Sequence, residues 1–142
     1  MAESELARKL KLKPDARAAV IAAPEGYLAD LEPLPQGVRL STRLAGPLDW
    51  LQLFVTTSAE LGKLAPKAAA ALKPEALLWI SFPKGSSGIQ TDLSRDKGWE
   101  GLEGTNLKWI TLVSVNPTWS AFALRPRRPG EAKQKSRFPG EQ

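Results

Sequence analysis

The sequence predicts a three-layer α/β domain built on a mostly parallel six-stranded sheet. Residues 18–23 and 77–82 are almost continuously apolar, as in strands that are buried on both faces. The first four strand-like runs lie at residues 17–23, 38–44, 50–55 and 76–82, and helical signals follow the first and the third of them. This alternation is typical of parallel strands joined by helical crossovers. The last two runs flank Asn116-Pro117-Thr118, a turn with proline in its preferred second position, which predicts an antiparallel hairpin.

The first half of the chain begins with a predicted helix over residues 4–11, for which Ser4 is the N-cap. A strand is predicted over residues 17–23; Pro24 ends it, and a short helix over residues 25–31 follows. Residues 38–44 alternate apolar and polar side chains, the period-two pattern of a half-exposed strand. This pattern predicts that the second strand lies at an edge of the sheet.

The second half opens on a predicted central strand at residues 50–55. Thr57 and Glu60 have the spacing of a capping box, which announces a helix. Because proline cannot donate a backbone hydrogen bond, we expect that helix to break at Pro66 and a second short helix to cover residues 66–72. The fourth strand is predicted at residues 76–82, a further helix from residue 93 or 94 to residue 102, and the hairpin strands at 107–115 and 119–124.

Right-handed crossovers give these strands a spatial order of 2-1-3-4-6-5, counted along the chain. The order reverses between the first and third strands. Open α/β sheets bind ligands in the crevice outside the carboxyl ends of their strands, at such a reversal. The loops that follow residues 23 and 55 flank this crevice, and the loop that begins at Lys84 lies one strand further along.

The composition excludes several kinds of chemistry. The chain has no cysteine and no histidine, so disulfides, thiolate metal sites and Ser-His or Cys-His nucleophiles are impossible. No carboxylates are clustered, so no metal site and no catalytic residue is predicted. No segment combines a basic start with a long apolar core, so we expect neither a signal peptide nor a membrane span, and a cytoplasmic protein.

The net charge of +5 is concentrated near the end of the chain. Residues 125–142 carry six basic and two acidic side chains, whereas the remaining 124 residues are close to neutral. We therefore divide the chain into a domain at residues 1–125 and a basic, flexible tail at residues 126–142. Nucleic acid is expected to meet only this tail, through weak electrostatic contacts.

The loop after the fourth strand is the strongest candidate for a binding site. Its glycines let backbone amides converge, its serines add hydroxyl donors, and its lysine supplies a positive charge, which together could cradle an anion. A flexible turn with a solvated lysine is the alternative. Asp92 is expected to cap the following helix or to pair with Lys84 or Arg95. The predicted site comprises Lys84, Gly85, Ser86, Ser87, Gly88, Thr91, Asp92 and Arg95, with Glu25, Tyr27 and Thr57 from the neighbouring strand ends.

The layout resembles a Rossmann-like fold of the class I methyltransferase type, shortened in its first half. The segment at residues 72–79 looks like the approach to the fifth strand of those enzymes, with Glu75-Ala76 where Gly-Gly usually stands. The chain is also similar to a bacterial family of small proteins known as a domain of unknown function, a resemblance that implies a fold and no activity. It rests on Leu10-Lys11-Leu12-Lys13-Pro14, Ala23-Pro24-Glu25-Gly26-Tyr27, residues 79–88, Thr91-Asp92-Leu93-Ser94-Arg95-Asp96 and Trp119-Ser120-Ala121.

Three functions follow from this reading. The first is a binding module for an anionic small molecule or phosphate at the carboxyl edge of the sheet. The alternative is a protein-interaction or regulatory module whose pocket is degenerate. The third, a divergent methyltransferase, lacks two features that S-adenosylmethionine sites use. The loop after the first strand has one glycine, Gly26, and the second strand ends in Thr42-Arg43 without a carboxylate. Trp99, in a polar segment, is a candidate for ligand stacking, although packing in the core is favoured.

Overall fold

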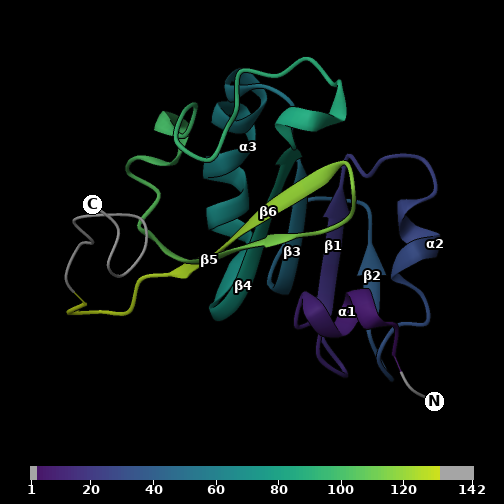
Figure 1. Cartoon of the computed structure of the whole chain (residues 1–142). Helices are drawn as coiled ribbons and strands as arrows, with labels where there is room; N and C mark the ends of the chain where they lie inside the picture. Colours follow the sequence, from purple (N-terminus) through teal and green to yellow (C-terminus); the bar gives the residue numbers. More distant parts are fainter. Residues whose placement is uncertain (1–2, 132–142) are drawn as a thin grey trace.

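The sheet has the predicted strand order. The computed structural model describes residues 3–131. Its six strands lie in the order β2-β1-β3-β4-β6-β5 (Figure 1). The parallel strands are β1 (Arg17–Ile21), β2 (Arg39–Ser41), β3 (Leu48–Phe54) and β4 (Leu72–Pro83), and the antiparallel hairpin consists of β5 (Leu107–Ser114) and β6 (Trp119–Pro126). β2 is an edge strand, as its alternating pattern predicts.

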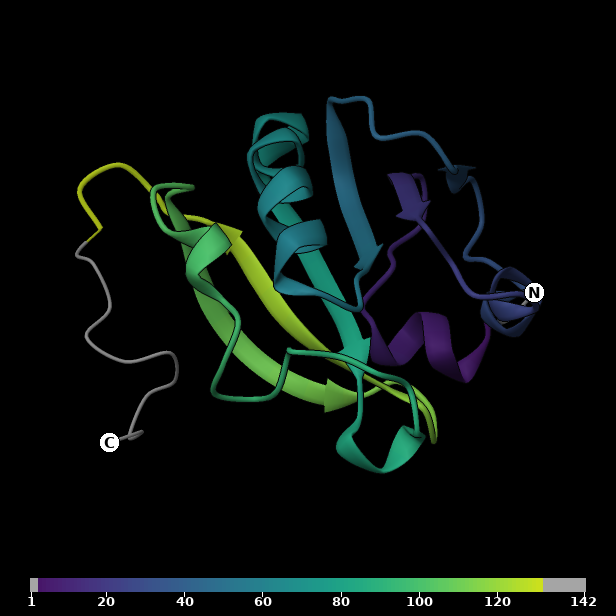
Figure 2. The ribbon, with the colours of Figure 1, turned by 90° about the horizontal axis from the view of Figure 1, so that it is seen from above.

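Helices cover both faces of the sheet, which makes the three layers. Seen from above, α3 (Ser58–Ala71) lies on one side of the sheet and α1 (Glu5–Lys9) on the other, while α2 (Tyr27–Leu31) lies beyond β1 (Figure 2). Along β4, Leu78 and Ile80 pack in the core on the α3 side, and Trp79 between them packs on the α1 side. The alternation of side chains along each strand therefore fills two separate cores.

The first helix is anchored to the centre of the sheet by two tryptophans. Ser4 is its N-cap, as predicted, and its Oγ accepts a hydrogen bond from the backbone N–H of Ala7. The indole Nε1–H groups of Trp50 and Trp79 both donate to the carbonyl oxygen of Leu10, at 2.8 and 2.7 Å. Both tryptophans are buried, so the helix closes this face of the sheet without leaving an indole nitrogen unpaired.

The predicted break at Pro66 is wrong, because α3 continues through this residue. Leu61, Ala65 and Ala68 keep helical spacing and are fully buried against the sheet. The missing hydrogen bond would have gone to the carbonyl of Gly62, which is exposed together with Pro66, so water can replace it. Packing along the inward face of the helix therefore outweighs the proline penalty of roughly 3 kcal/mol.

The helix predicted between residues 93 and 102 is also wrong. The segment is a loop with a single 3₁₀ turn, η2 (Glu100–Leu102). Gly98 has a φ of 99°, in the left-handed region, which stops a helix from passing. Leu93 and Trp99 are buried in the core on the α3 side, and the Nε1–H of Trp99 donates to the carbonyl of Ser94 at 2.6 Å. Trp99 is thus a core residue rather than a stacking platform for ligands.

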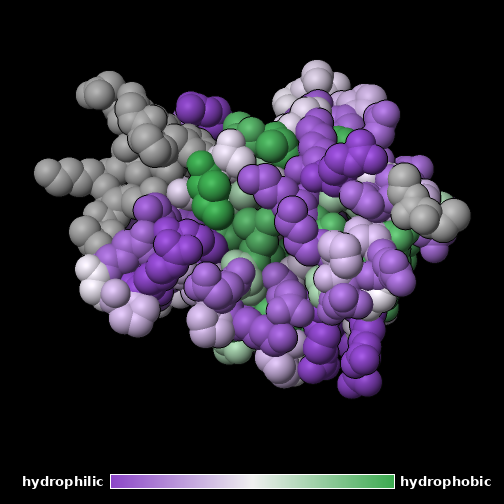
Figure 3. Space-filling view, turned by 90° about the horizontal axis from the view of Figure 1, so that it is seen from below, coloured by the Kyte–Doolittle hydropathy of each residue, from purple (hydrophilic) through white to green (hydrophobic). Residues whose placement is uncertain are grey.

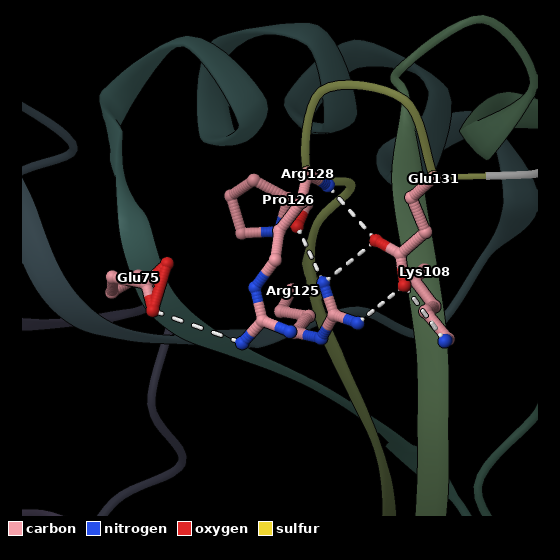
Figure 4. Close-up of polar contacts among 6 residues, drawn as sticks. All are labelled: Glu75, Lys108, Arg125, Pro126, Arg128 and Glu131. Carbon is pink, nitrogen blue, oxygen red and sulfur yellow. Dashed lines mark hydrogen bonds and ion pairs between the residues drawn. The ribbon is translucent and has the colours of Figure 1, made fainter.

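Glu131 ties the end of the described chain to the hairpin. Its carboxylate accepts hydrogen bonds from the guanidinium of Arg125 on β6, the ammonium of Lys108 on β5 and the backbone N–H of Arg128 (Figure 4). These donors hold the pKa of Glu131 far below its ordinary value, with Arg125 as the largest cause. The described part of the chain thus includes residues 126–131 of the predicted tail, and residues 132–142 lie outside the described residues.

The lower face of the molecule, where β1, β3 and β4 begin, is mainly hydrophilic with a hydrophobic area between polar regions (Figure 3). A cavity of about 440 Å³ opens at this end of the sheet, lined among others by Lys13, Asp49 and Leu77. Within residues 3–131, no helix has the length and apolar character that a membrane crossing requires.

Candidate ligand site at the carboxyl edge of the sheet

The predicted site residues lie where β1, β3 and β4 end, and one segment crosses this edge. After β4 the chain forms a 3₁₀ turn, η1 (Gly85–Ser87), on the α1 side and then runs back toward α3 (Figure 2). Thr91 fixes the crossing, because its hydroxyl donates to the carbonyl of Thr56, just past β3, at 2.5 Å. The segment ends at Leu93, which is buried in the core on the α3 side. The loop predicted to bind a ligand thus also covers the neighbouring strand end.

Lys84 is held by the hairpin. Its ammonium Nζ donates to Oγ of Ser114 at 2.6 Å, and its backbone N–H donates to the carbonyl of Thr118 at 2.8 Å. No hydrogen bond or ion pair joins it to Asp92 in the described part of the chain, so the predicted pairing with Asp92 is wrong. The positive charge is nevertheless located beside η1 at the carboxyl edge.

Asp92 caps α3 instead of a following helix. One carboxylate oxygen accepts from the backbone N–H of Ser58 and the other from the Ser58 hydroxyl, both at 2.7 Å. These two bonds lower the pKa of Asp92 from its ordinary value, and the bond from the Ser58 hydroxyl has the larger effect. The predicted partner Arg95 instead lies 3.4 Å from the carboxylate of Asp96, at an exposed position.

Glu60 accepts hydrogen bonds from the two threonines that precede α3. Its Oε1 accepts from the backbone N–H and the hydroxyl of Thr56, at 2.7 and 2.8 Å, and from the N–H of Thr57 at 3.2 Å. These bonds lower the pKa of Glu60. The Thr57 hydroxyl accepts from the N–H of Glu60, which completes the predicted capping box and commits Thr57 to the helix cap. Two of this chain's own carboxylates, Glu60 and Asp92, therefore lie at the helix end where an anion could otherwise bind.

Tyr27 fills the space beside the predicted crevice. Only 2% of its surface is exposed, its hydroxyl donates to Oε1 of Gln52 at 2.7 Å, and its ring meets the edge of Phe54 at 4.7 Å between centroids. Burial is the main reason why the pKa of Tyr27 is raised. Of the predicted residues in the first loop, Glu25 is the one left exposed. Tyr27 is thus part of the core rather than an exposed side chain of the crevice.

Gln52 and Ser81 continue this polar chain through the interior and were missed by the sequence reasoning. Gln52 Nε2 donates to the Ser81 hydroxyl at 3.0 Å, and both side chains are fully buried. The signal was present in the sequence, because each residue is a single polar residue inside an apolar strand. A polar group in such a position needs a buried partner.

The turn after β4 is the open part of this edge. Gly85, Ser86 and Gly88 are exposed, and a Cβ atom added at either glycine would meet no atom within 4 Å. Ser87 is partly engaged, because its Oγ accepts from the N–H of Ile89 at 3.1 Å. In residues 3–131, no three acidic, histidine or cysteine side chains come together as a metal site. The turn therefore presents exposed backbone at the carboxyl edge, with the Lys84 side chain beside it.

Comparison with known proteins shows the fold. No protein-family model matches the chain, and no curated protein sequence matches it. Solved structures do: the mitomycin 7-O-methyltransferase MmcR aligns over 78% of this chain with a TM-score of 0.61 and 12% identity. The ribosomal protein L11 methylase of Lactobacillus delbrueckii subsp. bulgaricus aligns over 87%, with a TM-score of 0.57 and 13% identity. The fold is the Rossmann-like fold of class I methyltransferases.

These solved structures share the fold with this chain at low sequence identity and, in part, are much longer than it. The aligned region covers 49% of MmcR, so the chain spans about half the length of that enzyme, and 76% of the L11 methylase. A third structure, the fibrillarin pre-rRNA processing protein of Methanococcus jannaschii, has a TM-score of 0.54 over 82% of this chain, with 14% identity. At such identities the likeness concerns the arrangement of helices and strands, and any activity must be argued from this chain's own residues.

Proposed function

We propose that this chain is a Rossmann-like binding module that takes a small anion of the phosphate class at the turn formed by residues 84–88. The observation that carries the proposal is a contrast along one sheet edge. The amides at the start of α3 bind Glu60 and Asp92, whereas the turn after β4 is exposed and has Lys84 beside it.

The chemistry of the turn fits such a ligand. Gly85 and Ser86 are exposed, so their backbone amides and the Ser86 hydroxyl can donate to anion oxygens, while the ammonium of Lys84 contributes a charge-assisted bond. Ser114 holds that ammonium at the turn in the absence of ligand, which reduces the ordering that binding requires. A module of this kind binds a ligand without catalysing a reaction.

Thermal denaturation with phosphate, pyrophosphate and sugar phosphates tests the proposal. The expected result is that one of these anions raises the Tm of the wild type, and that the Lys84→Ala variant loses the increase. Lys63→Ala removes an exposed lysine on α3 and is the matched control, which should keep the increase. Equal increases for the wild type and Lys84→Ala would contradict the proposal.

Binding of S-adenosylmethionine is the second candidate, and the likeness to methyltransferase structures favours it. Two observations count against the usual site: Tyr27 packs beside the crevice, and β2 ends at Ser41, with Thr42 and Arg43 rather than an acid directly after it. Titration calorimetry with S-adenosylmethionine separates the candidates. Heat that saturates at a 1:1 ratio and persists in Lys84→Ala would favour the methyltransferase function over the anion module.

A further inference from the structure

The segment that follows β4 is held at both of its ends. At its start, the backbone N–H of Lys84 donates to the carbonyl of Thr118 at 2.8 Å. At its end, the Thr91 hydroxyl donates to the carbonyl of Thr56 at 2.5 Å. In the described part of the chain, residues 85–90 make no hydrogen bond outside the segment. The position of the turn therefore depends on the attachments at the two ends.

The end near α3 has a second attachment, a clasp between Asp92 and Ser58. One carboxylate oxygen of Asp92 accepts from the backbone N–H of Ser58 and the other from the Ser58 hydroxyl, each at 2.7 Å. Hydrogen bonds to an ionised group are stronger than those between neutral groups. Ser58 is the first residue of α3, whose Leu61 and Ala65 are buried against the sheet, so the clasp joins the segment to a fixed part of the core.

The charge of Asp92 separates a positioning role from a simple electrostatic role. Its lowered pKa means that the carboxyl group is ionised at neutral pH. A negative charge repels an anion, so an aspartate that acted through its charge alone would weaken anion binding, and its removal would strengthen it. An aspartate that holds the turn in place has the opposite effect. The two roles therefore predict changes of opposite sign.

We propose that the clasp positions the turn at residues 84–88 for the anion, which makes Asp92 and Ser58 positioning residues of that site. This inference rests on the function proposed above. An anion that binds to the amides of the turn must order residues 85–90, and this ordering costs conformational entropy. Because Lys84 is fixed at one end and Asp92 at the other, part of the ordering precedes binding, which raises the affinity.

Calorimetric titrations of the whole chain with pyrophosphate at neutral pH test the clasp. Ser58→Ala removes one of its two bonds and leaves every charge in place. It should weaken pyrophosphate binding roughly two- to fivefold, somewhat less than the full worth of the lost hydrogen bond. Ser58→Thr keeps a hydroxyl at this position and should bind as the wild type does. Asp92→Asn should also weaken binding, although it removes a negative charge from this edge.

Asp96→Asn is the matched control, because it removes the same kind of charge from an exposed position beyond the buried Leu93. It should not weaken binding. Tighter binding of pyrophosphate by Asp92→Asn, or unchanged binding by both Asp92→Asn and Ser58→Ala, would overturn the proposal and leave the anion site itself in place.

A second measurement needs no anion. The ¹H–¹⁵N heteronuclear NOE reports the fast motion of each backbone amide. The values at Gly88 and Gln90 should fall in Ser58→Ala and Asp92→Asn, whereas those at Leu53 and Ile80, in the central strands, should stay the same. Unchanged values at Gly88 and Gln90 would refute the clasp. A wild type that does not bind pyrophosphate would instead refute the proposed function, and the NOE values would still decide whether the clasp orders the segment.

Discussion

Tyr27, Gln52 and Ser81 show how single residues decide that the sheet edge is closed. Their side chains form a buried chain of hydrogen bonds that joins the start of α2 to β3 and β4. The sequence placed Tyr27 at the crevice but could not show its direction, because a tyrosine at a loop end can point inward or outward. Its partner Gln52 is distant in sequence and near only after the strands have paired.

Replacing Tyr27 with phenylalanine tests this chain. The Tyr27→Phe variant keeps the ring against Phe54 and leaves Oε1 of Gln52 without its donor, so the free energy of unfolding should fall by about 1–2 kcal/mol. Urea denaturation measures the change. If the denaturation midpoint of Tyr27→Phe equals that of the wild type, water reaches Gln52, and the space between Tyr27 and β3 is open to solvent.

Asp92 makes a prediction about pH. Because the pKa of its carboxyl is lower in the folded chain, Asp92 stabilises the fold above the ordinary aspartate pKa of about 4 and loses this contribution as the pH falls below it. The Asp92→Asn variant should therefore have a lower Tm than the wild type at pH 7, and the difference should shrink in acid. Thermal denaturation of both proteins at pH 7 and at a pH below the ordinary aspartate pKa measures this difference in Tm. A difference in Tm that does not depend on pH would contradict the role of the Asp92 charge.

At the scale of elements, the strands were predictable and the connections between β4 and β5 were not. A strand at the edge of the sheet is half-exposed and alternates apolar and polar residues, as β2 does, whereas central strands are buried on both faces and are continuously apolar. The position of each strand in the sheet therefore follows from the sequence. Local rules failed at Pro66 and at residues 93–102, because the packing of α3 and the burial of Leu93 and Trp99 outweigh helix propensity. The same burial turns Asp92 toward Ser58, which no local pattern indicates.

Two glycines test the contact between α3 and η2. A Cβ at Gly101 would lie 2.9 Å from Cα of Gly62, whereas a Cβ at Gly62 would meet nothing within 4 Å. Gly101→Ala should therefore lower the free energy of unfolding by about 1–3 kcal/mol through overpacking. Gly62→Ala should raise it by roughly 0.5–1 kcal/mol, because alanine favours a helix. Denaturant titrations of both variants measure these effects, and equal changes would show that η2 does not pack closely on α3.

For the whole molecule, the fold is shared with methyltransferases, and the places beside the strand ends are filled by this chain's own side chains. The likeness to MmcR and the L11 methylase concerns the sheet and its helices. In this chain, side chains from α2, α3 and the segment after β4 occupy the places next to the strand ends. The turn at residues 84–88 remains open at this edge.

The most direct test of this account follows backbone amide signals in ¹H–¹⁵N spectra during separate titrations with pyrophosphate and S-adenosylmethionine. We predict that pyrophosphate shifts the amides of Gly85, Ser86 and Gly88 in the wild type and not in Lys84→Ala, while S-adenosylmethionine shifts none of them. Saturable shifts of the amides of Glu25, Gly26 and Thr57 with S-adenosylmethionine, and a silent turn with pyrophosphate, would contradict it.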